Sequence, residues 1–134
     1  QNEIVMKFDN TGDRFERIVH MTATHPANVQ PTQHGHSIGR WDGDTLVVDT
    51  VAFTPDKSGL GASVPSGPAK HTVERFALTP DKVHLRYEIT VEDPMYLTAP
   101  ATLTQQWEHR PDLEFSQDTG ACEPGARDKY KQAF

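Results

Sequence analysis

Apolar and polar residues alternate along many short segments of the chain, and this period of two is typical of strands that bury one face. Turn residues such as Gly, Pro, Asn and Asp separate the segments, which favours hairpins over long helices. The predicted hairpins pair residues 3–9 with 15–20, 36–41 with 45–53, 71–78 with 83–91, and 102–109 with 113–117. We therefore expect an all-β fold of about eight antiparallel strands.

Eight short strands must share one apolar face, so we expect a single small barrel or a jelly roll that encloses a cavity. The length is typical of one domain, so residues 1–134 are predicted to form a single domain. Residues 54–69 hold three prolines and three glycines, and we expect either a functional or a mobile loop there. The polar end, residues 124–134, is predicted to be a short helical tail or a frayed end.

The charge balance excludes some classes of partner. The chain has 13 Lys and Arg against 19 Asp and Glu, a net charge of −6, so it lacks the basic face that a nucleic acid requires. No apolar run approaches the roughly 20 residues that span a bilayer. No glycine pattern of a nucleotide site is present, so we expect no nucleotide cofactor. The single cysteine, Cys122, cannot form a disulfide within the chain.

Histidines are the most conspicuous candidates for chemistry, because the chain has seven of them. His34 and His36 are two residues apart, so on a strand they face the same way and could present two imidazoles to one ion. A third ligand could come from His25 or His71. Such a site suits Cu, Fe, Zn or Mn. The alternative is an exposed, hydrogen-bonded histidine pair.

Asp49 is the most conspicuous carboxylate, because it lies in an otherwise apolar strand. If Asp42-Gly43 form a two-residue turn, His36 lies directly opposite Asp49 on the neighbouring strand, and a slip of the turn would shift this pairing. Asp49 could orient a metal-bound His36, or the two could be an acid and base pair, with Arg40 stabilising an oxyanion. A purely structural cross-strand hydrogen bond is the alternative.

Other residues are candidates for catalysis or substrate binding. His71 and Glu74 are three apart, so a regular strand puts them on opposite faces; we expect His71 to point inward and keep Glu74 as a candidate catalytic carboxylate. Trp41, Tyr87 and Trp107 are predicted either to belong to the core or to line a pocket for a sugar or an aromatic ligand.

Three segments of the chain are similar to a known group of proteins: residues 71–76, residues 91–94 and, most distinctly, residues 35–50, which read Gly-His-Ser-Ile-Gly-Arg-Trp-Asp-Gly-Asp-Thr-Leu-Val-Val-Asp-Thr. These segments resemble an uncharacterised family of small secreted bacterial β-proteins, in which a signal peptide and a further N-terminal segment usually come first. The resemblance implies a secreted or periplasmic location and supplies no activity.

The same resemblance favours one set of metal ligands, because His25-Pro26, His36, Asp49 and His71 fall within its recurrent segments. It favours His25, His36 and His71 as the ligands and leaves His34 as the alternative ligand. A weaker likeness is to the cupins, whose metal is held by a His-x-His pattern, a nearby carboxylate and a distant histidine. The carboxylate expected shortly after His36 is missing here.

The leading functional prediction is a small secreted metal-dependent enzyme, an oxidoreductase with one His-ligated metal that acts on a small organic or saccharide substrate. One alternative is a metal-independent lyase, isomerase or dehydratase that uses a His-Asp acid and base pair. Another is a lipocalin-like protein whose cavity binds a small ligand without chemistry. An exposed edge strand would also allow a homodimer.

Overall fold

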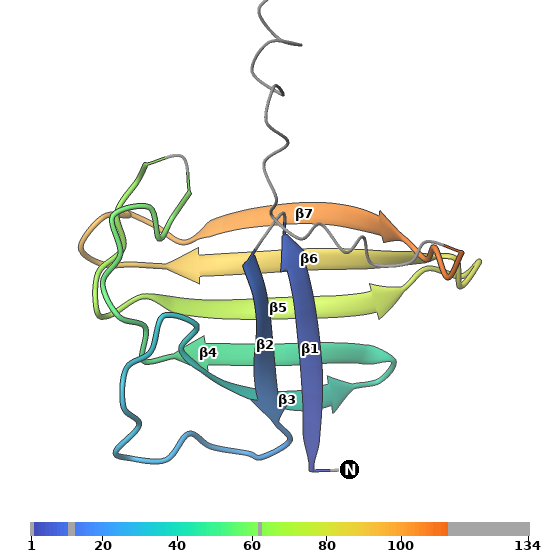
Figure 1. Ribbon diagram of the computed structural model, residues 1–134, viewed down its shortest axis with the longest axis horizontal. Helices are drawn as coiled ribbons and strands as arrows, with labels where there is room; N and C mark the ends of the chain where they lie inside the picture. Colours follow the sequence, from blue (N-terminus) through green and yellow to red (C-terminus); the bar gives the residue numbers. More distant parts are fainter. Residues whose placement is uncertain (1, 11–12, 62, 113–134) are drawn as a thin grey trace, which may run out of the picture.

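The computed structural model describes residues 2–10, 13–61 and 63–112, and within these ranges the chain forms strands and no helix. All strands belong to one sheet (Figure 1). The strands are β1 (Glu3–Asn10), β2 (Asp13–His20), β3 (His36–Asp42), β4 (Thr45–Val51), β5 (His71–Leu78), β6 (His84–Glu92) and β7 (Ala101–Glu108). The predicted all-β class is therefore confirmed.

The spatial order of the strands is the same as their order in the chain, from β1 to β7. Neighbours pair antiparallel, except for β2 and β3, which pair in parallel over two residue positions. The sheet curls into a half-barrel, so that the β1–β2 hairpin crosses over the β3–β7 strands (Figure 1). Of the two predicted architectures, the described residues form the barrel-like one and no second sheet.

The core lies between the β1–β2 hairpin and the face of the sheet that it crosses, which we call the inner face. Val19 on β2 and Leu46 and Val48 on β4 are its buried centre. Partly buried residues pack around them: Ile4, Met6, Met21 and Phe76. Gly39 permits the close approach, because a Cβ there would lie 2.7 Å from Cγ1 of Val19. The opposite side of the β3–β7 sheet is called the outer face.

A buried ion pair also joins the hairpin to the sheet. Nη1 of Arg17 on β2 lies 2.7 Å from Oε2 of Glu74 on β5, and the two side chains are 14% and 6% exposed. The hydroxyl of Tyr87 on β6 donates a hydrogen bond of 2.9 Å to Oε1 of the same carboxylate. Burial and the nearby Glu74 hold the pKa of Tyr87 well above its usual value, so the phenol stays a donor.

The β3–β4 turn lies one residue later in the chain than predicted. Asp42 pairs with Thr45, so the two loop residues are 43 and 44, and Gly43 occupies the first of them with φ of 59°. Glycine adopts this backbone conformation without the penalty of a Cβ. His36 therefore pairs with Val51, and the predicted direct pairing of His36 with Asp49 is wrong.

The long loop of residues 54–69 is held by hydrogen bonds within itself and to the side chain of Asp93. Asp56 and Ser66 exchange two of them, at 3.2 and 2.8 Å. The amide of Gly67 donates to Oδ2 of Asp93 at 2.7 Å, and the amide of Met95 donates to Oδ1 of Asp93 at 3.1 Å. The buried Asp93 carboxylate therefore fastens this loop to the connection that follows β6.

Two predictions fall outside the described residues: the second strand of the fourth hairpin, residues 113–117, and the tail of residues 124–134. The first strand of that hairpin is confirmed as β7. Among the described residues there is also no helix with the length and apolar character needed to cross a membrane.

Replacement of Arg17 by Met tests the buried ion pair. Arg17→Met leaves the Glu74 carboxylate buried without its cation, and breaking a buried pair in this way costs about 3–5 kcal/mol of unfolding free energy. Urea unfolding at neutral pH measures this loss.

The matched control is Lys7→Met, which removes the ion pair between Lys7 and Glu16, whose side chains are 72% and 60% exposed. We expect the control to leave the urea midpoint unchanged, because exposed pairs contribute little. An equally small effect of Arg17→Met would contradict the role assigned to the Arg17–Glu74 pair.

Candidate functional site

Polar side chains from three adjacent strands meet on the outer face of the sheet. Asp49 on β4 pairs with Ile38 on β3 and with Val73 on β5. His36 is two residues from Ile38, and His71 is two residues from Val73, so all three side chains project from the same face. The observed turn lies one residue later than predicted, which shifts the β3–β4 pairing by two residues. Because side chains alternate with a period of two, His36 and Asp49 still share a face.

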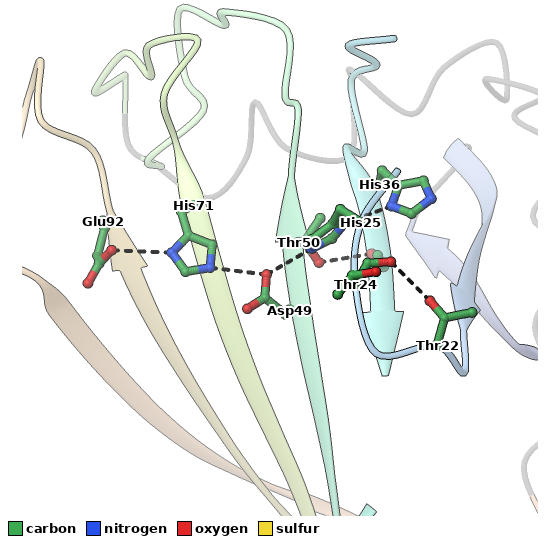
Figure 2. Close-up of polar contacts among 9 residues, drawn as sticks. Thr22, Thr24, His25, His36, Asp49, Thr50, His71 and Glu92 are labelled. Atoms are coloured by element: carbon green, nitrogen blue, oxygen red, sulfur yellow. Dashed lines mark hydrogen bonds and ion pairs between the residues drawn. The ribbon is translucent and has the colours of Figure 1, made fainter. Parts of the chain in front are cut away.

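His25 comes from the loop between β2 and β3 and links the strand residues to one another (Figure 2). Its Nδ1 lies 2.8 Å from Nδ1 of His36, and its Nε2 lies 3.1 Å from Oδ1 of Asp49. Nε2 of His71 also lies 3.1 Å from this oxygen, and Nδ1 of His71 lies 3.2 Å from Oε2 of Glu92. We call these five residues the histidine network.

The donors and acceptors of the network follow from the Asp49 carboxylate, which only accepts hydrogen bonds when ionised. His25 must then donate through Nε2, so in its neutral form it accepts at Nδ1 the proton of His36 Nδ1. This leaves Nε2 of neutral His36 with a free lone pair. Neutral His71 can donate to one of its two carboxylates, whereas its imidazolium form donates to both.

The network is partly shielded from water, with the side chains of His25, Asp49 and His71 exposed by 19%, 28% and 30%. The ring of His36 stacks on that of His20, with 5.0 Å between ring centroids. Burial, followed by the neighbouring His20 and His25, lowers the pKa of His36 below its ordinary 6.5. His36 is therefore neutral at neutral pH and can accept a proton.

A cavity of about 400 Å³ lies at the edge of β3, and Ile38 in its wall is two residues from His36 on the same face of the strand. In the described sheet β2 pairs with β3 only at Ser37 and Ile38, so the edge of β3 beyond this point is open. Residues from the end of β2, the start of the following loop and β3 line the cavity: Met21, Thr22, Ala23, Ile38, Gly39 and Arg40. Arg40 projects from the same face as His36, as predicted, and adds a positive charge to the cavity wall.

The three histidines predicted as metal ligands are brought together, but they lie in a chain. His36 and Asp49 contact opposite ring nitrogens of His25, so the three imidazoles do not surround one point. No group of three or more His, Cys, Asp or Glu residues in the described part of the chain is placed to hold a metal ion. His34 stacks on Phe15, with 4.3 Å between ring centroids. Metal binding stays a prediction.

The remaining predicted site residues lie on the inner face, and the structure does not bring them to the histidine network. Glu74 is held by Arg17 there, while Trp41 pairs with Leu46. Tyr87 stacks on Trp107, with 4.7 Å between ring centroids. The expected single interior site is thus replaced by two sets of residues on opposite sides of the sheet.

His20 and Glu92 belong to the site and were not identified from the sequence. The parallel β2–β3 pairing brings His20 beside His36, and a hairpin pattern does not predict that pairing. Glu92 pairs directly with His71 in the β5–β6 register. The predicted pairing of residues 71–78 with 83–91 does not give this register, because in the structure Leu78 pairs with Leu85.

Comparisons of the chain with protein-family models, with curated proteins and with solved structures gave no match. The resemblance of residues 35–50 to secreted bacterial proteins, and the export that it implies, therefore stay predictions. The chemistry of the site rests on the geometry of its own residues.

Titration of His36 followed by NMR tests the electrostatics of the site. We expect a pKa below 6.5, and we expect His20→Phe, which keeps the stacking but removes the charge, to raise it. Because the folded pKa is lowered, the contribution of neutral His36 to stability is complete above pH 6.5 and is lost as the pH falls through the lowered pKa.

The control for this titration is His109→Gln, because the exposed His109 is not in contact with the network. A His36 pKa at or above 6.5, or one that His20→Phe leaves unchanged, would contradict the electrostatic account.

Proposed function

We propose that the histidine network is the catalytic centre of a metal-independent proton-transfer enzyme, a lyase, isomerase or dehydratase that acts on a small organic or saccharide substrate. One observation carries the proposal: Nδ1 of His36 is 2.8 Å from His25, whose other nitrogen is 3.1 Å from Asp49. A carboxylate that orients an imidazole is the usual way to prepare a general base.

In this mechanism His36 is the general base. Its Nε2 lone pair takes a proton from a substrate carbon next to a carbonyl group, and the Nδ1 proton stays hydrogen-bonded to His25. The positive charge that forms on His36 is stabilised by Asp49 through the intervening His25. The same proton is then available for return to the substrate or to a leaving group.

Arg40 and His71 support this step from two sides. Arg40 lines the cavity at the edge of β3, where its guanidinium stabilises the oxyanion that forms when the carbon loses its proton. His71 is a positioning residue: its two ring nitrogens contact the carboxylates of Asp49 and Glu92, and this bridge fixes the orientation of the Asp49 carboxylate.

The cavity restricts the class of substrate. A volume of about 400 Å³ accommodates a small organic acid or a monosaccharide. The wall carries one cation, Arg40, beside the apolar side chains of Met21, Ala23 and Ile38. A substrate with a carbonyl oxygen and an adjacent acidic C–H bond fits both features.

Hydrogen exchange with solvent tests this function without knowledge of the full reaction. The protein is incubated in D₂O with a panel of keto acids and keto sugars, and loss of the C–H signal next to each carbonyl is followed by ¹H NMR. We expect catalysed exchange for at least one member, with a rate that chelator does not alter. Removal of the base in His36→Gln should lower this rate by about 10²–10⁴-fold, the usual contribution of general base catalysis.

His109→Gln is the matched control and should retain the full exchange rate. Asp49→Asn should lower the rate as well, because the amide cannot provide the negative charge that stabilises protonated His36. Catalysed exchange that survives His36→Gln, or its absence across the panel, would contradict the proposal.

A metal-dependent oxidoreductase is the second candidate, and one observation favours it. Nε2 of His25 and Nε2 of His71 both lie 3.1 Å from Oδ1 of Asp49, and two imidazoles with one carboxylate form a ligand set that suits Fe, Cu, Zn or Mn. Holding an ion requires these nitrogens to turn from the carboxylate oxygen toward a common point.

Metal content by mass spectrometry, after loading with each metal in turn, separates the two candidates. Near-stoichiometric metal that is lost in Asp49→Asn would support the oxidoreductase. Protein that binds none and still catalyses exchange would support the proton-transfer enzyme.

A further inference from the structure

A second cavity of about 400 Å³ lies on the inner face, on the opposite side of the sheet from the histidine network. The loop of residues 54–69 borders it through Gly59 and Leu60. Most of its remaining wall is apolar and comes from β6, β7 and the connection between them: Ile89, Val91, Leu97, Ala101 and Leu103. The side chain of Leu103 is 60% exposed, so the cavity opens along β7.

Lys70 brings a positive charge into this apolar wall. Its Nζ donates a hydrogen bond of 3.1 Å to the carbonyl oxygen of Gly59 and lies 4.1 Å from the centroid of the Phe53 ring. No carboxylate of the described residues lies within ion-pair distance of this ammonium group. Burial lowers the pKa of Lys70, because the charged form lacks the solvation that it has in water, and the carboxylates of Asp56 and Asp93 partly offset this effect.

Arg17 adds a second cation to the cavity wall. Its Nη1 is paired with Glu74, and its Nη2 lies 3.2 Å from Sδ of Met6. Its Nε is buried and has no hydrogen-bond partner among the described residues. Glu74 is the one carboxylate among the lining residues, and its ion pair with Arg17 leaves Lys70 as the cation of the wall without a carboxylate at ion-pair distance.

We propose that this cavity binds a monoanionic amphiphile, a carboxylate with an unbranched apolar chain. The carboxylate pairs with the Lys70 ammonium group, and the chain lies along Ile89 and Val91 toward the opening at Leu103. An apolar wall with a few convergent polar groups is the usual composition of a small-molecule site. This site is separate from the histidine network and does not depend on the reaction proposed for it.

Isothermal titration with octanoate and with octanol tests the proposal, because the two ligands share a chain and differ in charge. We expect saturable binding of one octanoate per chain and about tenfold weaker binding of octanol, the factor that corresponds to one partly buried charge pair. Lys70→Met should weaken octanoate about tenfold and leave octanol unchanged. Lys57→Met, at an exposed position of the same loop, is the matched control and should change neither.

Leu103→Asp is a second variant at an exposed position that packing does not constrain, and it keeps the test decisive if Lys70→Met fails to fold. A carboxylate at the opening should weaken both ligands. His36→Gln should bind octanoate as the native protein does, so loss of the proposed reaction leaves this result intact. Absence of saturable octanoate binding, equal affinity for octanoate and octanol, or no effect of Leu103→Asp would overturn the proposal.

Discussion

The alternation of side chains along β4 is the constraint on which the rest of the structure depends. Leu46 and Val48 point to the inner face and form the core with the β1–β2 hairpin, whereas Val47 and Asp49 point to the outer face. Because the period of a strand is two, a slip of one residue would move the carboxylate into the core and the core residues to the outside. The energy of core packing therefore also fixes the position of the site.

This constraint explains how a half-barrel positions a polar network without enclosing it. The strands supply His36, Asp49 and His71 at neighbouring positions, and a loop segment brings His25 to them. Asp49 is the common acceptor of two imidazoles, so it both attaches the loop to the sheet and sets the protonation pattern. The attachment of the loop and the proposed chemistry thus depend on the same carboxylate oxygen.

Much of the fold was predictable from the sequence, because alternation and turn residues are local signals. The residues of β5, His71–Leu78, agree with the prediction, and strand periodicity correctly puts His71 and Glu74 on opposite faces. The expectation that His71 points inward is wrong, because Glu74 is the buried residue of the two and His71 lies on the outer face with Asp49. The turn was predicted one residue too early, since an Asp-Gly pair does not by itself show whether Gly is the first or the second loop residue. That difference leaves His36 and Asp49 on the same face of the sheet. Their common face was therefore predicted correctly, although their direct cross-strand pairing was not.

The rest of the site depends on contacts that no local pattern contains. The parallel pairing of β2 with β3 places His20 beside His36, and the path of the loop after β2 places His25 over Asp49. Which face of the sheet becomes the core was also not determined by alternation, because both faces of β4 carry buried residues. The predicted interior site is therefore observed on the outer face.

The protonation pattern of His36 is the most direct test of the central claim, that this histidine is a general base oriented by His25 and Asp49. Nitrogen-15 NMR of the imidazole rings at a mildly alkaline pH, where the rings are neutral, identifies the nitrogen that carries the proton. The account predicts that His36 is protonated at Nδ1 and unprotonated at Nε2, with His25 protonated at Nε2. A His36 ring that carries its proton at Nε2 would contradict it.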